Sequence, residues 1–399
     1  MTIPKDVDFI DYDGRLVYSY TAQEFLALEA MPANPSNPGL VAQGWNWTLT
    51  DAKEYVTQWG CLVIGQTYAT SDGKTRVYLE VPQSLVDIQA TLNVRLYGIT
   101  SGSGTISWGD GSTTNLASGT GNKNHSHVYT TAGYYKIEIN IVSGTYAIGY
   151  QGANIGTFYS STSYNANSRW GAYIYKIEIG NNITKFGRQP FRNLFALQSI
   201  TIPNTVTGFN ETTAPDGNVI ESYKMRGIVF PSGFQGKTSG VIGIMHSMKY
   251  ISLPTSITKL GINTSTAYNL RKFTMYFLGG SASNTIKLAY AGRLTHFVLP
   301  GDYTTLVTAT LQGSMVKRVV VPASVTTIQT EAFMNNYFLE LHMLSTTVPT
   351  LGNTRAFLNI GPNAVIYVPY SEDHSVLNAY KTATNWATYA SYMQEEPQS

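Results

Sequence analysis

Apolar side chains recur at regular intervals through the second half of the chain. The repeated unit has apolar residues at its positions 1, 4, 6, 10 and 13, proline at position 7 and threonine at position 11. Complete copies occupy residues 197–209, 248–260 and 316–328. Weaker copies begin at Ile174, Met225, Leu270 and Leu294, and a last one lies at 366–369. The proline, or the residue in its place, recurs with spacings of 23, 28, 23, 22, 24 and 22 residues between positions 180 and 322.

A repeat of this length is too short to fold alone. Burial of five or six apolar side chains contributes about 10 kcal/mol, at about 2 kcal/mol each. Ordering about 22 backbone residues costs roughly 20 to 40 kcal/mol. Neighbouring repeats must therefore stack on one another. The pattern predicts a solenoid over residues 172–370, with one short strand per coil and a continuous apolar interior.

This unit, in which Ile and Val fill many of the apolar positions, resembles the BspA-type leucine-rich repeat. The resemblance covers about 200 residues and implies an architecture rather than an activity. Residues 371–399 follow the last repeat. Ser371, Glu372 and Asp373 favour a helix start, and apolar residues recur at helical spacing up to Met393. We expect an amphipathic helical cap over the last coil.

The first 84 residues mix helical and strand patterns, which predicts a small α+β module. Residues 16–20 alternate like a strand, and Thr21 with Glu24 has the spacing of a capping box at the start of a helix of about eight residues. A second helix is expected over residues 51–58, ended by Gly60.

Two further strands are expected in this module, at residues 62–68 and 76–81. Ser71-Asp72-Gly73-Lys74 lies between them. Asp-Gly supplies the positive φ angles that a tight hairpin turn needs, so the two strands are predicted to form a hairpin.

Residues 85–148 contain only strand and turn patterns, with three short motifs in order. These motifs are Trp108-Gly-Asp110-Gly-Ser, His127-x-Tyr129 and Ala132-Gly-x-Tyr135. Together they resemble the PKD domain, an immunoglobulin-like β-sandwich. The resemblance implies that Trp108, Asp110, His127 and Tyr129 form a structural motif, with Asp110, His127 and Tyr129 as internal hydrogen-bond partners. The alternative is a metal site at Asp110, His125 and His127, because residues two apart on a strand face the same way.

Aromatic residues concentrate between the sandwich and the solenoid. Six tyrosines fall between positions 146 and 175, and Phe158 and Trp170 join them around a Gly-, Ser- and Asn-rich segment, residues 149–171. One interpretation is a domain junction whose rings pack against both neighbours. The other is a recognition surface, because rigid rings give contact area at low entropic cost. Its ligand-binding residues would be Tyr159, Tyr164 and Trp170.

The amino-acid composition of the chain argues against several classes of function. Charged residues make up 13% of the chain and the formal net charge is +2, which argues against a nucleic-acid partner held by bulk positive charge. The single cysteine, Cys61, lies in an apolar run and predicts a buried thiol without a disulfide. No phosphate loop, nucleophile elbow or carboxylate pair stands out. We expect no enzymatic activity, no metal and no cofactor.

The sequence therefore predicts a mainly β, multidomain recognition protein. The segment from Tyr12-Asp13-Gly14 to Gly44-Trp45-Asn46-Trp47-Thr48 resembles the opening of prophage-encoded proteins of gut bacteria. The resemblance implies a virion protein of tail-fibre, receptor-binding or surface-decoration type, made in the host cytoplasm. Residues 1–84 would attach it to other virion proteins, and the distal domains would bind a host surface protein or polysaccharide.

Two alternatives stay open. Familiar BspA-type proteins are exported and anchored, which implies a bacterial cell-surface adhesin. The charged first residues do not resemble a signal peptide, and no apolar run is long enough to predict membrane insertion. The third hypothesis is a carbohydrate-active enzyme that uses the sandwich and the repeats as binding modules. Self-association is left open.

Overall fold

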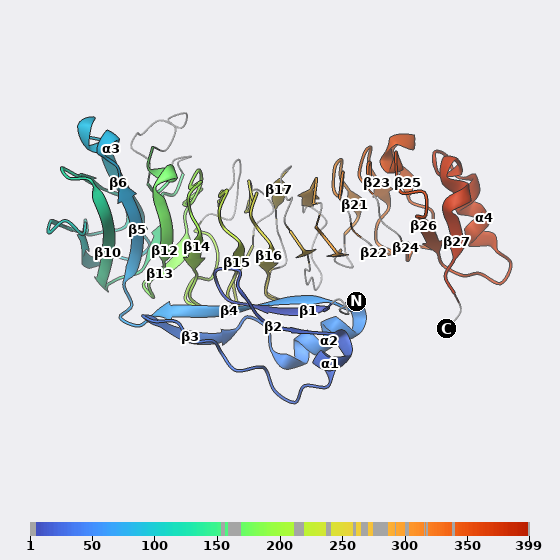
Figure 1. Cartoon of the computed structure of the whole chain (residues 1–399), viewed down its shortest axis with the longest axis horizontal. Helices are drawn as coiled ribbons and strands as arrows, with labels where there is room; N and C mark the ends of the chain where they lie inside the picture. The colour runs from blue at the N-terminus through green and yellow to red at the C-terminus, as the bar shows by residue number, and fades with distance from the viewer. Residues whose placement is uncertain are drawn as a thin grey trace.

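A computed structural model describes residues 5–152, 156–158, 169–210, 219–236, 241–257, 261–264, 270–273, 286–291, 293–299, 303–314, 316, 318–336 and 340–397. The protein is mainly β, with 35% strand and 13% helix, as the sequence predicts. Figure 1 shows a long row of coils that begins at a β-sandwich and ends at a helix, with a small α+β module along one flank.

The N-terminal module is a four-stranded sheet with two helices packed against it. Its strands lie in the order β2-β1-β4-β3, and β1 runs parallel to β4 while the other pairs are antiparallel. The elements are β1 (Val7–Ile10), β2 (Leu16–Tyr20), α1 (Ala22–Leu26), β3 (Leu40–Trp45), α2 (Leu49–Trp59) and β4 (Leu62–Thr70).

The local signals of this module are confirmed. The Thr21 hydroxyl accepts from the Glu24 amide, and the Glu24 carboxylate accepts from the Thr21 amide, so the capping box forms, although α1 is shorter than expected. Gly60 ends α2 in the left-handed conformation, with φ of 75°. Cys61 is a buried free thiol.

The predicted hairpin is wrong. β4 is buried along its whole length and pairs with β1 on one edge and β3 on the other, so no edge remains for β5 (Thr75–Val81). Residues 71–74 carry the chain out of this sheet, and β5 pairs with β10 and β12 instead. The N-terminal sheet therefore ends before β5, and residues 75–84 belong with the sandwich.

The sandwich consists of two sheets on a shared apolar core. The larger sheet has the order β14-β12-β5-β10-β7-β8 and the smaller one β13-β11-β6-β9. Val77 of β5, Val94 of β6 and Ile139 of β10 are fully buried in one cluster. The elements are α3 (Gln83–Asp87), β6 (Thr91–Gly98), β7 (Ser103–Ser107), β8 (Thr113–Asn115), β9 (Gly121–Val128), β10 (Gly133–Ser143) and β11 (Tyr146–Ile148).

The solenoid continues both sheets of the sandwich. A 3-10 helix, η1 (Arg169–Ala172), leads to β12 (Ile174–Glu178), which pairs with β5 and, on its other edge, with β14 (Ser199–Thr201). In the smaller sheet, β13 (Ile183–Phe186) pairs with β11. Backbone pairing therefore continues from both sheets of the sandwich into the first coil of the solenoid. One apolar cluster includes residues of both parts.

The solenoid proper is an eight-stranded parallel sheet of order β15-β16-β18-β20-β22-β24-β26-β27. Gly227, Tyr250, Lys272, His296 and Arg318 are successive partners in it, 23, 22, 24 and 22 residues apart, as the proline spacing predicts. The strands before the last are β15 (Gly227–Val229), β16 (Tyr250–Ser252), β18 (Lys272–Phe273), β20 (His296–Val298), β22 (Arg318–Val321), β24 (Glu340–Met343) and β26 (Val365–Val368).

Shorter strands pair elsewhere along several of the described coils. They form one two-stranded and one three-stranded parallel sheet, and Phe333 stacks on Phe357 between neighbouring coils at a centroid distance of 5.1 Å. The elements are β17 (Ile262–Thr264), β19 (Ile286–Leu288), β21 (Thr305–Leu306), β23 (Thr327–Ile328), β25 (Thr350–Leu351) and the 3-10 helix η2 (Thr354–Phe357).

The chain ends on the last coil. α4 (Ser375–Thr382) and the 3-10 helix η3 (Trp386–Tyr392) precede β27 (Met393–Glu395), which adds to the sheet beside β26. Tyr380 donates to the Ser345 carbonyl at 2.8 Å and Trp386 to the Pro349 carbonyl at 2.7 Å. α4 begins four residues later than the predicted helix start at Ser371.

The N-terminal module lies against the flank of the solenoid (Figure 1). The Asn46 amide donates to the Phe230 carbonyl and the Trp47 indole donates to the Leu253 carbonyl, at 2.8 Å each. Gly14, with φ of +81°, lies so close to Gly227 that an added Cβ would sit 2.5 Å from the Gly227 nitrogen. Module and solenoid therefore meet through buried side chains and a direct backbone contact.

Candidate functional site

The residues of the Trp-Gly-Asp-Gly-Ser motif form one packed cluster in the sandwich. The His127 imidazole stacks on the fully buried Trp108 ring at a centroid distance of 4.8 Å, and its Nε2 lies 2.7 Å from Asp110 Oδ2. Tyr129 donates its hydroxyl to the Trp108 carbonyl at 2.8 Å. Asp110 and His127 are thus hydrogen-bond partners of each other, whereas Tyr129 is hydrogen-bonded to the main chain of Trp108.

Burial and hydrogen bonds together set the pKa values in this cluster. Partial burial of Asp110 opposes its ionisation, but hydrogen bonds from Ser112 and His127 outweigh burial and lower the pKa of the carboxyl group. Burial raises the pKa of the Tyr129 hydroxyl above its ordinary value. The cluster therefore keeps a carboxylate and a neutral phenol.

His125 does not join Asp110 and His127. Its Nε2 accepts from the Ala117 amide at 3.1 Å and its Nδ1 lies 3.4 Å from the Val94 carbonyl, so both ring nitrogens have protein partners. Burial lowers the pKa of this imidazole. Within the described ranges, no three His, Cys, Asp or Glu side chains are arranged to hold a metal ion.

The predicted aromatic surface is described only in part, because Tyr159 and Tyr164 lie outside the described residues. Trp170 is fully buried, and its indole donates to the Thr91 carbonyl at 2.9 Å. Phe158 and Tyr146 are fully buried as well. A ring without an exposed face cannot stack on a ligand, so Trp170 is a core residue here rather than part of a surface.

A charged network crosses the sheet where the sandwich meets the solenoid, and none of the sequence motifs predicted it. The peptide Tyr-Lys-Ile-Glu-Ile occurs twice, at 135–139 in β10 and at 175–179 in β12. The Lys-Ile-Glu part of both copies pairs antiparallel with β5 in the same register, so Arg76 faces Glu138 on one side and Glu178 on the other. The duplicated peptide is the signal that could have predicted this arrangement.

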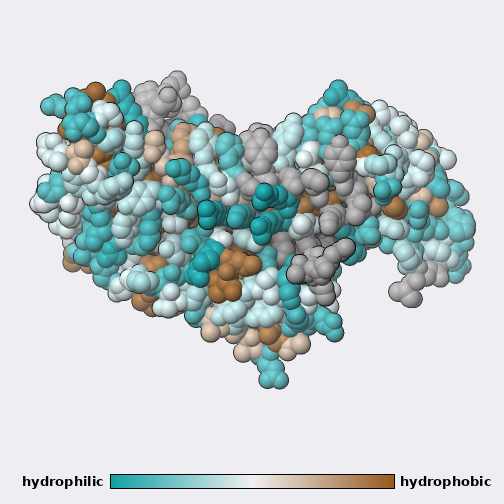
Figure 2. Space-filling view, viewed as in Figure 1, coloured by the Kyte–Doolittle hydropathy of each residue, from teal (hydrophilic) through white to brown (hydrophobic). Residues whose placement is uncertain are grey.

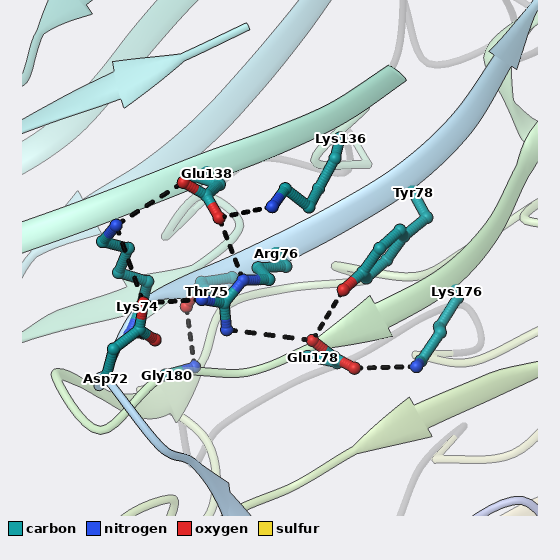
Figure 3. Close-up of polar contacts among 10 residues, drawn as sticks. All are labelled: Asp72, Lys74, Thr75, Arg76, Tyr78, Lys136, Glu138, Lys176, Glu178 and Gly180. Carbon is teal, nitrogen blue, oxygen red and sulfur yellow. Dashed lines mark hydrogen bonds and ion pairs between the residues drawn. The ribbon is translucent and has the colours of Figure 1, made fainter. Parts of the chain in front are cut away.

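Figure 3 shows Arg76 between the two glutamates. Its guanidinium lies 3.1 Å from Glu138, 3.9 Å from Glu178 and 2.6 Å from Asp72. Lys136 contacts Glu138 at 2.9 Å and Lys176 contacts Glu178 at 2.7 Å. Every carboxylate of the network thus has a cation beside it.

Two hydroxyl groups complete this network. Tyr78 donates to Glu178 at 3.0 Å, and burial together with the Glu178 charge raises the pKa of Tyr78 to about 12. Thr75 accepts from the Gly180 amide at 2.8 Å. Such a neutralised network holds strands together. It lacks the free carboxylate that acid–base chemistry needs.

A pocket of about 480 Å³ lies between the N-terminal module and the solenoid. Asp13, from the turn between β1 and β2, lines one side. The other lining residues, Gln198, Ser199, Lys224, Arg226 and Ser247, come from three successive coils. The pocket is polar, with two cations and one carboxylate. A basic residue before the strand recurs in neighbouring repeats, and this recurrence is the sequence signal that could have predicted the cationic wall.

The match to a known protein family lies in the repeats. The family described as BspA type Leucine rich repeat region matches in six copies, over residues 162–279 and 221–340, just under half of the chain. No curated protein matches the sequence. Among the described residues, no helix has the length and apolar character needed to cross a membrane. The repeats at 162–340 are therefore similar to the BspA-type leucine-rich repeat, and the described coils have a solenoid arrangement.

Proposed function

We propose that this chain is a non-enzymatic virion protein of a bacteriophage, of tail-fibre, receptor-binding or surface-decoration type. In this proposal it binds a protein or glycan of the host surface through its sandwich and repeat domains. The observation that carries the proposal is the polar pocket, built by side chains from three successive coils and from the docked N-terminal module. Repeat solenoids characteristically bind partners through surfaces that several coils share.

Two finer assignments belong to this proposal. The sandwich would be an immunoglobulin-like domain of PKD type, which is supported by the Asp110 to His127 and Tyr129 to Trp108 hydrogen bonds. α4 and η3 would be a cap that shields the last coil. Support for this assignment comes from the complete burial of Tyr380 and from Trp386, which is 1% exposed.

The N-terminal module would join the chain to other virion proteins. β2 and β3 are the two edges of its sheet, and Leu16 and Val41 on these strands are 44% and 53% exposed. A sheet edge with exposed apolar side chains can pair with a strand of another chain.

Mass spectrometry of purified phage particles tests this function. Lysates from an induced host are separated on a density gradient, and we expect peptides of this chain to co-sediment with capsid proteins. An abundant host cytoplasmic enzyme serves as the control and should stay at the top of the gradient. Absence of the chain from infectious particles would contradict the proposal.

The same fractions test the alternatives. The BspA-type repeats favour a cell-surface adhesin as the second candidate, because familiar members of that family are surface proteins. An adhesin would be found in the cell-wall fraction of uninduced cells. The third hypothesis, a carbohydrate-active enzyme, requires release of reducing sugar from a polysaccharide that is lost when one carboxylate is replaced.

A further inference from the structure

Cationic side chains line up along successive coils beside the pocket. Arg226, Lys249 and Arg271 hold the same place in three consecutive coils, because the Lys249 amide donates to the Arg226 carbonyl at 2.7 Å and the Arg271 amide to the Lys249 carbonyl at 3.0 Å. Neighbouring strands lie about 4.8 Å apart. Lys224 precedes Arg226 by two residues. We call Lys224, Arg226, Lys249 and Arg271 the basic stripe.

The positive charge of the basic stripe is largely unbalanced. Lys224, Arg226 and Arg271 are exposed and Lys249 is half-buried. In the described part of the chain none of the four forms a salt bridge, in contrast to the cations around Glu138 and Glu178. Arg271 lies over the Tyr250 ring, 6.0 Å from its centroid. Figure 2 shows hydrophilic residues gathered over the middle coils, above the N-terminal module.

Two carboxylates of the N-terminal module lie near the basic stripe. Asp13 lines the pocket together with Lys224 and Arg226. Burial, and then the nearby charge of Asp8, raise the pKa of the Tyr250 hydroxyl, but Asp8 is itself buried and accepts from Ser19 at 2.6 Å. Four cations against these two carboxylates leave a positive potential along the basic stripe.

A row of stacked rings lies on the three coils that build the pocket wall. The Phe195 and Tyr223 rings lie 4.6 Å apart and the Tyr223 and His246 rings 4.7 Å apart, within 12° of parallel. Tyr223 and His246 directly precede Lys224 and Ser247 of the pocket wall. The Tyr223 ring is stacked on both faces, which holds the three coils in register with one another.

We propose that the pocket and the basic stripe bind an acidic polysaccharide, a chain of sugars that carry carboxylates. This inference rests on the proposed recognition function and names its ligand class. The basic stripe pairs with carboxylates that recur along the polymer, because its own cations recur with each coil. Gln198, Ser199 and Ser247 match sugar hydroxyl groups, which are both donors and acceptors.

Asp13 favours a sugar over DNA as the ligand. Its carboxylate can accept hydrogen bonds from sugar hydroxyl groups, whereas a DNA phosphodiester has no donor to offer and would be repelled. The low net charge of +2 also argues against DNA as the ligand.

Binding of the full-length protein to polygalacturonate tests the inference, with the methyl-esterified polymer as the uncharged control. We expect binding to the acid polymer only, and a severalfold loss of affinity between about 0.05 M and about 0.3 M salt, where the screening length falls. Equal binding to the ester would overturn the proposal, and so would tighter binding to DNA of equal charge.

A matched pair of variants locates the site. K224Q/K249Q removes two charges of the basic stripe and should weaken binding by about tenfold. K53Q/K381Q makes the same chemical change on α2 and α4 and should stay within about twofold of the original affinity. Circular dichroism and melting temperature confirm that both variants fold. Equal loss in the two variants, or none in either, contradicts the assignment of the site.

Two combinations of results distinguish a failure of this inference from a failure of the proposed virion function. A protein that is present in phage particles and binds host cells, but does not distinguish polygalacturonate from its ester, refutes the inference alone. A protein that binds polygalacturonate through the basic stripe but is absent from particles refutes the virion function alone.

Discussion

Replacement of Arg76 by methionine removes the cation that contacts carboxylates of both β10 and β12. Arg76 is 13% exposed and contacts Glu138, Glu178 and Asp72. Methionine retains the apolar stem that packs on the sheet, so the substitution mainly removes charge and hydrogen bonds. We expect R76M to loosen the contact between the sandwich and the first coil.

The size of the effect follows from the burial of the partners. Loss of one partner from a buried ion pair costs about 3 to 5 kcal/mol, and an exposed pair contributes about 0 to 1 kcal/mol. Glu178 is 5% exposed and Glu138 22% exposed. Lys176 stays beside Glu178, and Lys136 stays beside Glu138. We therefore expect a loss of about 2 to 3 kcal/mol, below the fully buried limit.

Hydrogen exchange followed by mass spectrometry measures this loss locally. A loss of about 2 to 3 kcal/mol speeds exchange of the β5 and β12 amides by about 30-fold to about 150-fold. R355M is the matched control, because Arg355 is 56% exposed and pairs only with Glu331 among the described residues. Its cost should stay below about 1 kcal/mol. Equal effects of R76M and R355M on β5 exchange would refute the network as the link.

Periodicity was enough to predict the solenoid. Each coil needs the same inward side chains and neighbouring coils must stay in register, so the spacing of prolines predicts the strand pairing. Local signals such as the capping box at Thr21 and Glu24 could also be predicted from the sequence, because a helix start depends on residues a few positions apart.

Contacts between distant segments were not predictable in this way. The turn at Asp72-Gly73 has the composition of a hairpin, but β1 and β3 occupy both edges of β4, and only the tertiary fold decides that competition. Asn46 and Ser252 are 206 residues apart and hydrogen-bonded. Nothing local to Trp47 indicates that its partner is a coil of the solenoid. The pocket depends on this docking, so it could not be predicted either.

Two further substitutions test the sandwich and the docking contact. The pKa of Asp110 is lowered in the folded state, so its charge stabilises the fold above about pH 4. This contribution is lost as the pH falls through the lower folded value. Urea unfolding between pH 5 and pH 2 should therefore show a weaker pH dependence for D110N than for the parent protein. G14A should lower the melting temperature by several degrees and release the module, because the new Cβ would meet Gly227 at 2.5 Å in addition to the strain of φ at +81°. G39A has nearly the same φ, +76°, but no atom within 4 Å of its Cβ, so it carries the conformational strain alone. If limited proteolysis at residues 71–74 increased equally in both variants, the Gly14 to Gly227 contact would not be what holds the module in place.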